Sequence, residues 1–192
     1  MNNYEYILAS LPLLQPDYRG SLDADGLLEE ITSQLSESDG KALSLLLEGW
    51  NADSLTEGFY EKTTSHRNSF LRDYFLYDLQ LRNCKVAWLN KALGRPEGQD
   101  IMPCSEEVFE DEGKVLEILS QSDILGREKG LDELLWDHID AITALHVFDL
   151  DLILAFAAKL KIVDRWIRLD ETTGRELFEK LVSDLKSHHI EE

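Results

Sequence analysis

The chain has 192 residues, and its 38 acidic against 19 basic side chains give a formal net charge of −19. Hydrophobic residues make up 43% of it, which is enough to bury a core and argues against wholesale disorder. Such a charge repels nucleic acid and anionic lipid, so we expect neither as a partner and favour basic protein surfaces.

No pattern in the sequence indicates export or membrane insertion. The N-terminal segment MNNYEYILASLPLLQPDY has no basic leader, so we expect no signal peptide. No stretch approaches the roughly 20 apolar residues that span a bilayer. Cys84 and Cys104 are too few for a disulfide framework. We therefore expect a cytoplasmic protein, at most peripheral to a membrane.

The first third of the chain predicts three short helices. Residues 4–14 carry apolar side chains at helical spacing, although the alternation at their start leaves a strand possible. SLDADGLLEEITSQL and SESDGKALSLLLEGW each begin with candidate N-caps and predict an antiparallel helix pair. The competing caps are Ser21 and Asp23 for the first of these helices and Ser36 and Ser38 for the second.

A long proline-free segment follows, from Thr56 to Leu93. As one helix it would be about 57 Å long, against roughly 40 Å for the diameter of a compact domain of this size. We therefore predict either an elongated fold with one long central helix or a break within TTSHRNS. In the second case Asn68 or Ser69 caps a helix that ends at LGRP.

The linker EGQDIMPCSEEVFEDEG is the best internal boundary. It separates residues 1–96, the N-terminal helices plus the long central helix, from residues 105–192, a C-terminal helical bundle packed on it. The two parts could also form a single domain. The predicted fold class is all-α, a helical bundle that could be elongated.

The predicted elements of the second part are as follows. Ser105 and the acids after it start a helix, and DILGREKG forms a loop. Three further helices lie at about 131–146, 149–168 and 172–187, and Asp170 and Thr172 are natural caps for the last of them.

Sequence motifs for catalysis are absent. We find no glycine-rich nucleotide loop, no nucleophile elbow and no zinc-type cysteine spacing, so we expect neither an enzyme nor a cofactor. The best metal candidate is DELLWDHIDAITALH, which contributes Glu133, Asp137, His138, Asp140 and His146. The alternative function is therefore a helical metalloprotein or hydrolase that uses carboxylates near Asp137, His138 and Asp140, although one acidic helix face is usually just solvated.

The first of two basic features lies in the long helix. Asp78, Arg82 and Lys85 fall inside its apolar arc, where an unpaired charge would be costly. We expect a paired network, in which Arg82 and Lys85 meet acids from packed helices. The functional alternative is a polar slot that receives a partner's side chain.

The second basic feature is a stripe of Lys161, Arg165 and Arg168, which recur at i, i+4 and i+7 in KLKIVDRWIRLD. The stripe could dock an acidic partner. It could equally neutralise the chain's own acidic run, EEVFEDE, at residues 106–112.

Three stretches together resemble a known family: YEYILASLPLL, NSFLRDYFLYDLQLRNCKVAWLNKALGRP and DLDLILAFAAKLKIVDRWIRLDETTGRELFEKLV. They resemble an uncharacterised bacterial family whose members accompany V-type ATPase subunits and look like a shortened C subunit. The C subunit is all-helical and non-catalytic, and it sits as a socket between the membrane rotor ring and the central stalk.

The resemblance implies a structural or coupling subunit of a rotary V-type ATPase, held at the inner membrane through the rotor ring and the central stalk. The chain is much shorter than a three-lobed C subunit, so a complete funnel is not implied, and no binding residues are carried over. The remaining hypothesis is a helical adaptor unrelated to any ATPase.

Overall fold

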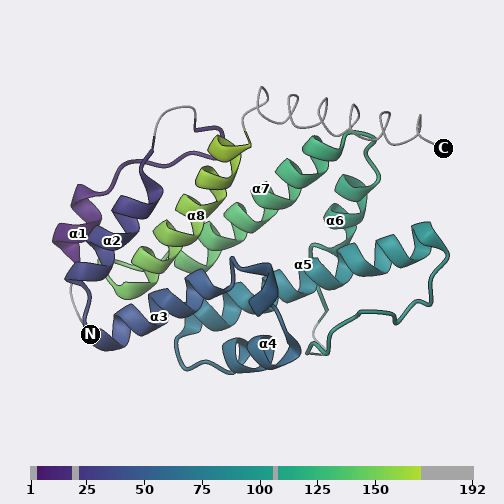
Figure 1. Cartoon of the computed structure of the whole chain (residues 1–192), viewed down its shortest axis with the longest axis horizontal. Coiled ribbons are helices and arrows are strands. Elements are labelled where there is room, and N and C mark those ends of the chain that lie inside the picture. The colour runs from purple at the N-terminus through teal and green to yellow at the C-terminus, as the bar shows by residue number, and fades with distance from the viewer. Residues whose placement is uncertain (1–3, 19–21, 106–107, 170–192) are drawn as a thin grey trace, which may run out of the picture.

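The computed structural model describes residues 4–18, 22–105 and 108–169. Within these ranges the chain is a bundle of α-helices without a strand, so the predicted all-α class is confirmed (Figure 1). The helices are α1 (Glu5–Ser10), α2 (Ala24–Gln34), α3 (Glu37–Glu48), α4 (Glu57–Thr64), α5 (Ser69–Leu93), α6 (Glu112–Leu119), α7 (Ile124–Thr143) and α8 (Leu150–Arg168), with a 3-10 turn at Ala52–Ser54.

The long segment is broken where its polar stretch predicts a break. α4 ends at Thr64, and the side chain of Asn68 caps α5 by accepting from the backbone N–H of Leu71 at 2.9 Å. Gly94, with a φ of 64°, adopts the left-handed conformation that ends α5. The long central helix is therefore α5, with 25 residues.

The caps of α2 and α3 follow the local sequence, but the packing of these helices does not. Asp23 caps α2 and Ser36 caps α3, while Ser21 lies outside the described residues. Both helices pack chiefly against α8, so their main contact is not with each other, as the predicted antiparallel pair would require. The buried side chains of both helices belong to the same core cluster as those of α8.

Two boundaries in the second half differ from the prediction. DILGREKG is not a loop, because Asp123 caps α7 by accepting from the backbone N–H groups of Leu125 and Gly126 at 3.1 and 3.0 Å. Gly130 then lies within this helix, where a Cβ would be 3.0 Å from the side chain of Ile118 on α6. These glycines thus permit a cap and a close helix crossing rather than a turn.

The helix predicted to start at Ser105 starts at Glu112 instead. The segment before it is held on α5 by Tyr77, whose hydroxyl donates to Asp111 at 2.8 Å and whose ring meets Phe109 edge-on. The predicted helix at 172–187, with its caps Asp170 and Thr172, lies outside the described residues.

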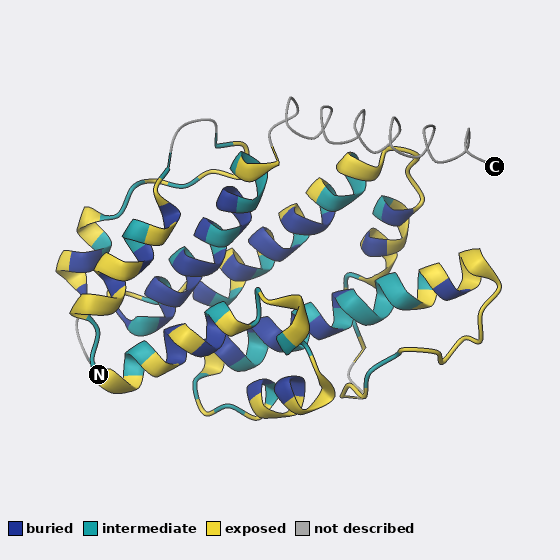
Figure 2. Ribbon diagram, in the orientation of Figure 1, coloured by how far each residue is buried: buried dark blue, intermediate teal, exposed yellow. Residues whose placement is uncertain are grey.

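The core lies around two helices, α5 and α8. Ile153, Leu154 and Leu160 on α8 are completely buried, and α2, α3, α5 and α7 all contact this helix (Figure 2). α5 packs against α4, α6 and α7. Among the described residues, no helix is both long enough and apolar enough to cross a bilayer.

Candidate functional site: a charged cleft between α5, α7 and α8

A cleft of about 160 Å³ lies where α5, α7 and α8 meet the end of α3. Six charged side chains line it: Asp78, Arg82, Lys85, Glu128, Asp132 and Arg165. The structure thus brings the predicted trio of α5 together with Arg165 from the predicted basic stripe of α8. Trp50 and Tyr74 add an indole and a phenol to the wall.

Asp78 is held by a tyrosine rather than by a cation. The hydroxyl of Tyr60, a buried residue of α4, donates to Asp78 Oδ2 at 2.7 Å. Burial raises the pKa of Asp78, and the Tyr60 hydrogen bond and the positive charges of Arg82 and Lys85 lower it in part. The pKa of Tyr60 lies far above its ordinary value because the hydroxyl is buried beside this carboxylate.

Arg82 does not form an ion pair with Asp78, although the two are one helical turn apart. Its Nη1 donates to the backbone carbonyl of Asp100 at 3.0 Å and, at 3.3 Å, to Asn83 Oδ1. The Asn83 amide in turn binds the backbone of Met102 in both directions, at 2.9 and 3.1 Å. Arg82 therefore fastens the linker after α5 and contacts no carboxylate in the described part of the chain.

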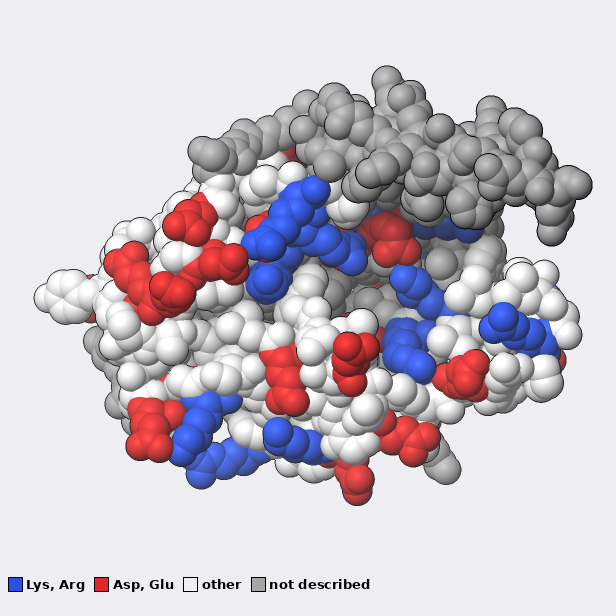
Figure 3. Space-filling model, viewed as in Figure 1, with Lys and Arg blue, Asp and Glu red and all other residues white. Residues whose placement is uncertain are grey.

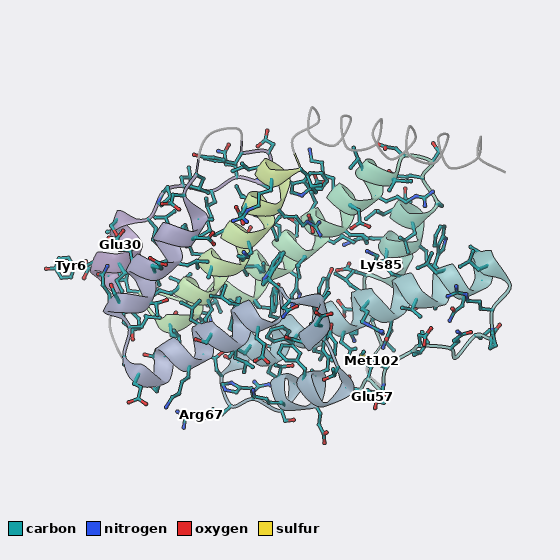
Figure 4. The ribbon with its side chains drawn as sticks, viewed as in Figure 1. Tyr6, Glu30, Glu57, Arg67, Lys85 and Met102 are labelled. Atoms are coloured by element: carbon teal, nitrogen blue, oxygen red, sulfur yellow. The ribbon has the colours of Figure 1, made fainter. Side chains whose placement is uncertain are left out.

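Lys85 meets an acid from a packed helix, as the sequence predicts. Its Nζ lies 3.1 Å from Glu128 Oε1 on α7, and both side chains are more than a third exposed. Figure 4 places Lys85 on the side of α5 that faces this helix. Beside this pair the guanidinium of Arg127 lies 5.2 Å from the ring centre of Trp88, so α5 and α7 have two charged contacts at the rim.

The inner wall of the cleft is formed by Asp132 and Arg165. An Nη2 donor of Arg165 and, at 2.7 Å, the indole N–H of Trp166 bind Asp132 Oδ2. Burial raises the pKa of Asp132, and these two donors oppose that effect. Asp132 was not among the residues predicted from the sequence, although it gives the same signal as Asp78: an acid, here next to Leu131, within an apolar helical pattern.

The rest of the basic stripe is paired with acids outside the cleft. Lys161 lies 3.6 Å from Asp164, and Arg168 contacts Asp164 at 2.8 Å and Asp25 of α2 at 3.1 Å. The stripe therefore neutralises acids of α2, α7 and α8, and the described residues of the run 106–112 are not its partners. Figure 3 shows basic side chains gathered over the C-terminal end of α8.

The predicted metal ligands are dispersed. Glu133 lies 3.7 Å from Lys129, and Asp140 is paired with Lys159. His138 stacks on Tyr77 with ring centres 3.9 Å apart, and burial lowers its pKa. His146, by contrast, lies 2.7 Å from the α8 cap Asp149. In the ranges that the structure describes, no three His, Cys, Asp or Glu side chains are grouped to hold a metal ion.

Comparison with known proteins gives one match. Residues 104–189 match a family model described as "Protein of unknown function (DUF2764)". Neither the curated proteins nor the solved structures contain a match to the chain. The matched range supplies Glu128, Asp132 and Arg165 to the cleft, while Asp78, Arg82 and Lys85 precede it. Over its C-terminal part, this chain is therefore similar to a family of uncharacterised proteins whose description states no activity and no partner.

Proposed function

We propose that this protein is a non-catalytic structural or coupling subunit of a V-type ATPase, a shortened counterpart of the C subunit that contacts the rotor ring and the central stalk. The observation that carries its partner-binding role is a group of large apolar side chains at one end of the molecule. This group, the apolar end, consists of Tyr6 on α1 and of Leu145, Val147 and Phe148 in the loop between α7 and α8.

The side chains of the apolar end are more exposed to solvent than large apolar side chains usually are. Tyr6 is 91% exposed, Leu145 95% and Val147 70%, and Tyr6 projects from the end of the bundle in Figure 4. Large apolar side chains that a folded surface leaves exposed close to one another commonly mark a protein–protein contact. Here the backbone hydrogen bond between Tyr4 and Phe148 brings the start of α1 to the loop between α7 and α8.

The backbone at the apolar end is fixed in an unusual conformation. Phe148 has a φ of 53°, which is rare for a bulky residue, and its carbonyl accepts from the backbone N–H of Tyr4 at 2.8 Å. Asp149, the next residue, caps α8 through the N–H of Leu152. The loop is thus joined to α1 and presents its apolar side chains from a constrained position.

The charges near this end indicate which kind of partner fits. Glu29 and Glu30 of α2 are exposed, and Figure 3 shows acidic side chains over the α1 and α2 end of the face in view. An apolar patch beside acids suits a protein surface with apolar and basic residues, and it suits neither nucleic acid nor anionic lipid. In this proposal the protein reaches the membrane only through its partner subunits.

Affinity purification of the tagged chain from its native cells, in gentle detergent, tests the proposal. We expect rotor-ring and central-stalk subunits to co-purify with the unaltered chain. The variant Leu145→Ser/Val147→Ser should lose them. Leu89→Ser/Leu93→Ser makes the same change in exposed residues of α5, at the other end of that helix from its cap, and should retain them.

The experiment tests separately whether the protein belongs to a V-type ATPase and whether the apolar end binds its partners. If the unaltered chain returns no rotor or stalk subunit, the assignment to a V-type ATPase is refuted. If these subunits co-purify equally well with the Leu145→Ser/Val147→Ser variant, the apolar end is not their binding surface. Circular dichroism of each variant shows whether the fold is retained, which we expect because the altered side chains are largely exposed.

A further inference from the structure

A groove of about 650 Å³ lies between α3 and the turn that joins α4 to α5. We call it the basic groove, because the described charged side chains that line it are Lys41, Lys62 and Arg67 against a single acid, Asp39. This balance is unusual in a chain with 38 acidic and 19 basic side chains. Arg67 projects from the edge of the molecule in Figure 4, and Figure 3 shows basic side chains gathered along the same edge, below α3.

Two of these bases meet no acid among the described residues. Lys41 is paired with Glu37 at 2.6 Å, whereas Lys62 and Arg67 are exposed and form no ion pair within the part of the chain that the structure describes. Burial lowers the pKa of His66, and the positive charges of Arg67 and Lys62 lower it further. The two unpaired bases therefore lie close enough together to act on one ring, so positive potential is concentrated in the groove.

Hydrogen bonds fix the backbone of the turn that presents these bases. The N–H of Asn68 donates to Nδ1 of His66 at 3.1 Å, and the guanidinium of Arg72 donates to the carbonyl of His66 at 3.1 Å. The side-chain amide of Asn68 also donates to Asp151 of α8 at 2.6 Å. Because Nδ1 is an acceptor, the neutral His66 ring carries its proton on Nε2, which is one more donor among the lining side chains. The turn is therefore ordered before a partner binds, which reduces the entropic cost of association.

We propose that the basic groove binds an acidic segment of another protein, whose carboxylates pair with Lys62 and Arg67. Ala42, Leu45 and Leu150 complete the lining and provide apolar contacts for the same segment. Opposite charges that face each other across an interface fix its register and suppress wrong partners. The basic groove shares no residue with the apolar end, and this inference does not depend on the assignment to a V-type ATPase.

The composition of the groove favours a protein segment over other anions. A phosphate ion or a nucleic-acid backbone has no apolar group to place on the leucines of the lining, whereas a protein interface combines apolar and charged contacts. A bilayer surface with anionic lipid also meets the whole net charge of −19, which repels it. A short acidic segment experiences mainly the charges near it, because screening limits their range to about 8 Å at physiological ionic strength.

Fluorescence anisotropy with a defined probe tests this proposal on the full chain. The probe is a short labelled peptide composed of glutamate and leucine, and the comparison peptide has glutamine in place of every glutamate. At an ionic strength of about 0.15 M, we expect saturable binding of the glutamate peptide, about tenfold tighter than that of the glutamine peptide. Nuclear magnetic resonance of the ¹⁵N-labelled chain locates the peptide: the backbone signals of His66 and Leu45 should shift, and that of Leu93 should stay in place.

Two matched variants test the roles of the bases. Lys62→Gln/Arg67→Gln removes both unpaired charges and should weaken binding of the glutamate peptide about tenfold, the effect of losing two exposed charge contacts. Lys91→Gln/Arg95→Gln makes the same change in exposed bases near the other end of α5, about 37 Å along the helix from its cap. This control should leave the affinity within about twofold. Lys62→Arg/Arg67→Lys keeps both charges and should bind the peptide as the unaltered chain does.

Four results would overturn the proposal. In the first, the glutamate peptide does not bind, or the two peptides bind alike. In the second, inorganic phosphate or vesicles that contain phosphatidylserine bind more tightly than the peptide, so the groove takes a phosphate group or a lipid. In the third, sedimentation shows that the chain self-associates and that Lys62→Gln/Arg67→Gln abolishes this, so the occupant is a second copy. In the fourth, the two glutamine variants bind the peptide alike. The unaltered chain decides the first two even if a variant does not fold.

Discussion

Replacing Tyr60 by phenylalanine removes a single hydroxyl from the core and tests the electrostatics of the charged cleft. Tyr60 is 2% exposed, and its hydroxyl lies 2.7 Å from Asp78 Oδ2. Loss of a hydrogen bond to a charged group costs about 1.5–3 kcal/mol. For a chain of this length, that lowers the midpoint of thermal unfolding by about 3–12 °C, measurable by calorimetry or circular dichroism.

The loss should also depend on pH. The folded-state pKa of Asp78 is raised, so its contribution to stability is complete below the unfolded-state pKa, about 3.9, and is lost as pH rises through the folded-state pKa. Without the Tyr60 donor this pKa rises further. Tyr60→Phe should therefore reduce the free energy of unfolding more at pH 7 than at pH 4.5.

A matched control deletes the same hydroxyl at a wetter site. Tyr77 donates to Asp111 at 2.8 Å, but Lys114 binds the same carboxylate at 2.7 Å and holds its pKa below the usual range. Tyr77→Phe should therefore cost only about 0.5–1.5 kcal/mol. If Tyr60→Phe costs no more than Tyr77→Phe, or costs the same at both pH values, Tyr60 is not paired with a buried carboxylate.

Two further predictions concern packing and coupling. Gly49→Ala should reduce the free energy of unfolding by about 1–3 kcal/mol, because its Cβ would lie 2.4 Å from the buried ring of Phe75. Gly40→Ala in α3 meets open space and should raise the free energy of unfolding by about 0.5–1 kcal/mol. Urea unfolding compares the two variants, and equal effects would contradict the structure. Asp78→Leu and Arg82→Leu should show a coupling energy of no more than about 1 kcal/mol in a double-mutant cycle, at the low end of the range for neighbouring residues. The reason is that Arg82 acts on Asp78 through its charge and makes no direct ion pair with it. A coupling energy well above this value would place the guanidinium on the carboxylate.

Local chemistry made the caps predictable. Asn68 and Ser36 each precede an apolar helical pattern, and each side chain accepts from a backbone N–H three residues later. Gly94 ends α5 for an equally local reason, since glycine adopts a positive φ without strain. The break between α4 and α5 followed from these signals, together with the length limit on a single helix.

Tertiary packing determined some helix ends and helix partners that local sequence patterns did not predict. DILGREKG contains two glycines and looks like a loop, but Gly130 is needed for the close approach of α6. α2 and α3 follow each other in sequence, yet both pack on α8, which lies more than a hundred residues later in the chain. Local patterns predicted the helices here, and contacts between distant segments determined their ends and partners.

Asp78, Arg82 and Lys85 show that helical spacing likewise does not predict the partners of individual side chains. Helical spacing places Asp78 one turn before Arg82, which suggests a pair. The acceptor that Arg82 uses is the carbonyl of Asp100, in a linker that returns along α5. Asp78 is bound by Tyr60, which is 18 positions earlier in the sequence. Spacing identified residues that line a site, but the partner of each depended on segments that approach only in the folded chain.

The distribution of charge distinguishes the charged cleft from the apolar end. The chain carries −19 overall, yet the six charged residues of the cleft contribute three charges of each sign. The excess negative charge therefore lies elsewhere on the chain. The apolar end, beside the exposed acids of α2, gains from this excess charge when it meets a basic protein. Electrostatic attraction thus favours a basic protein partner at the apolar end, whereas the side chains that line the cleft largely balance one another.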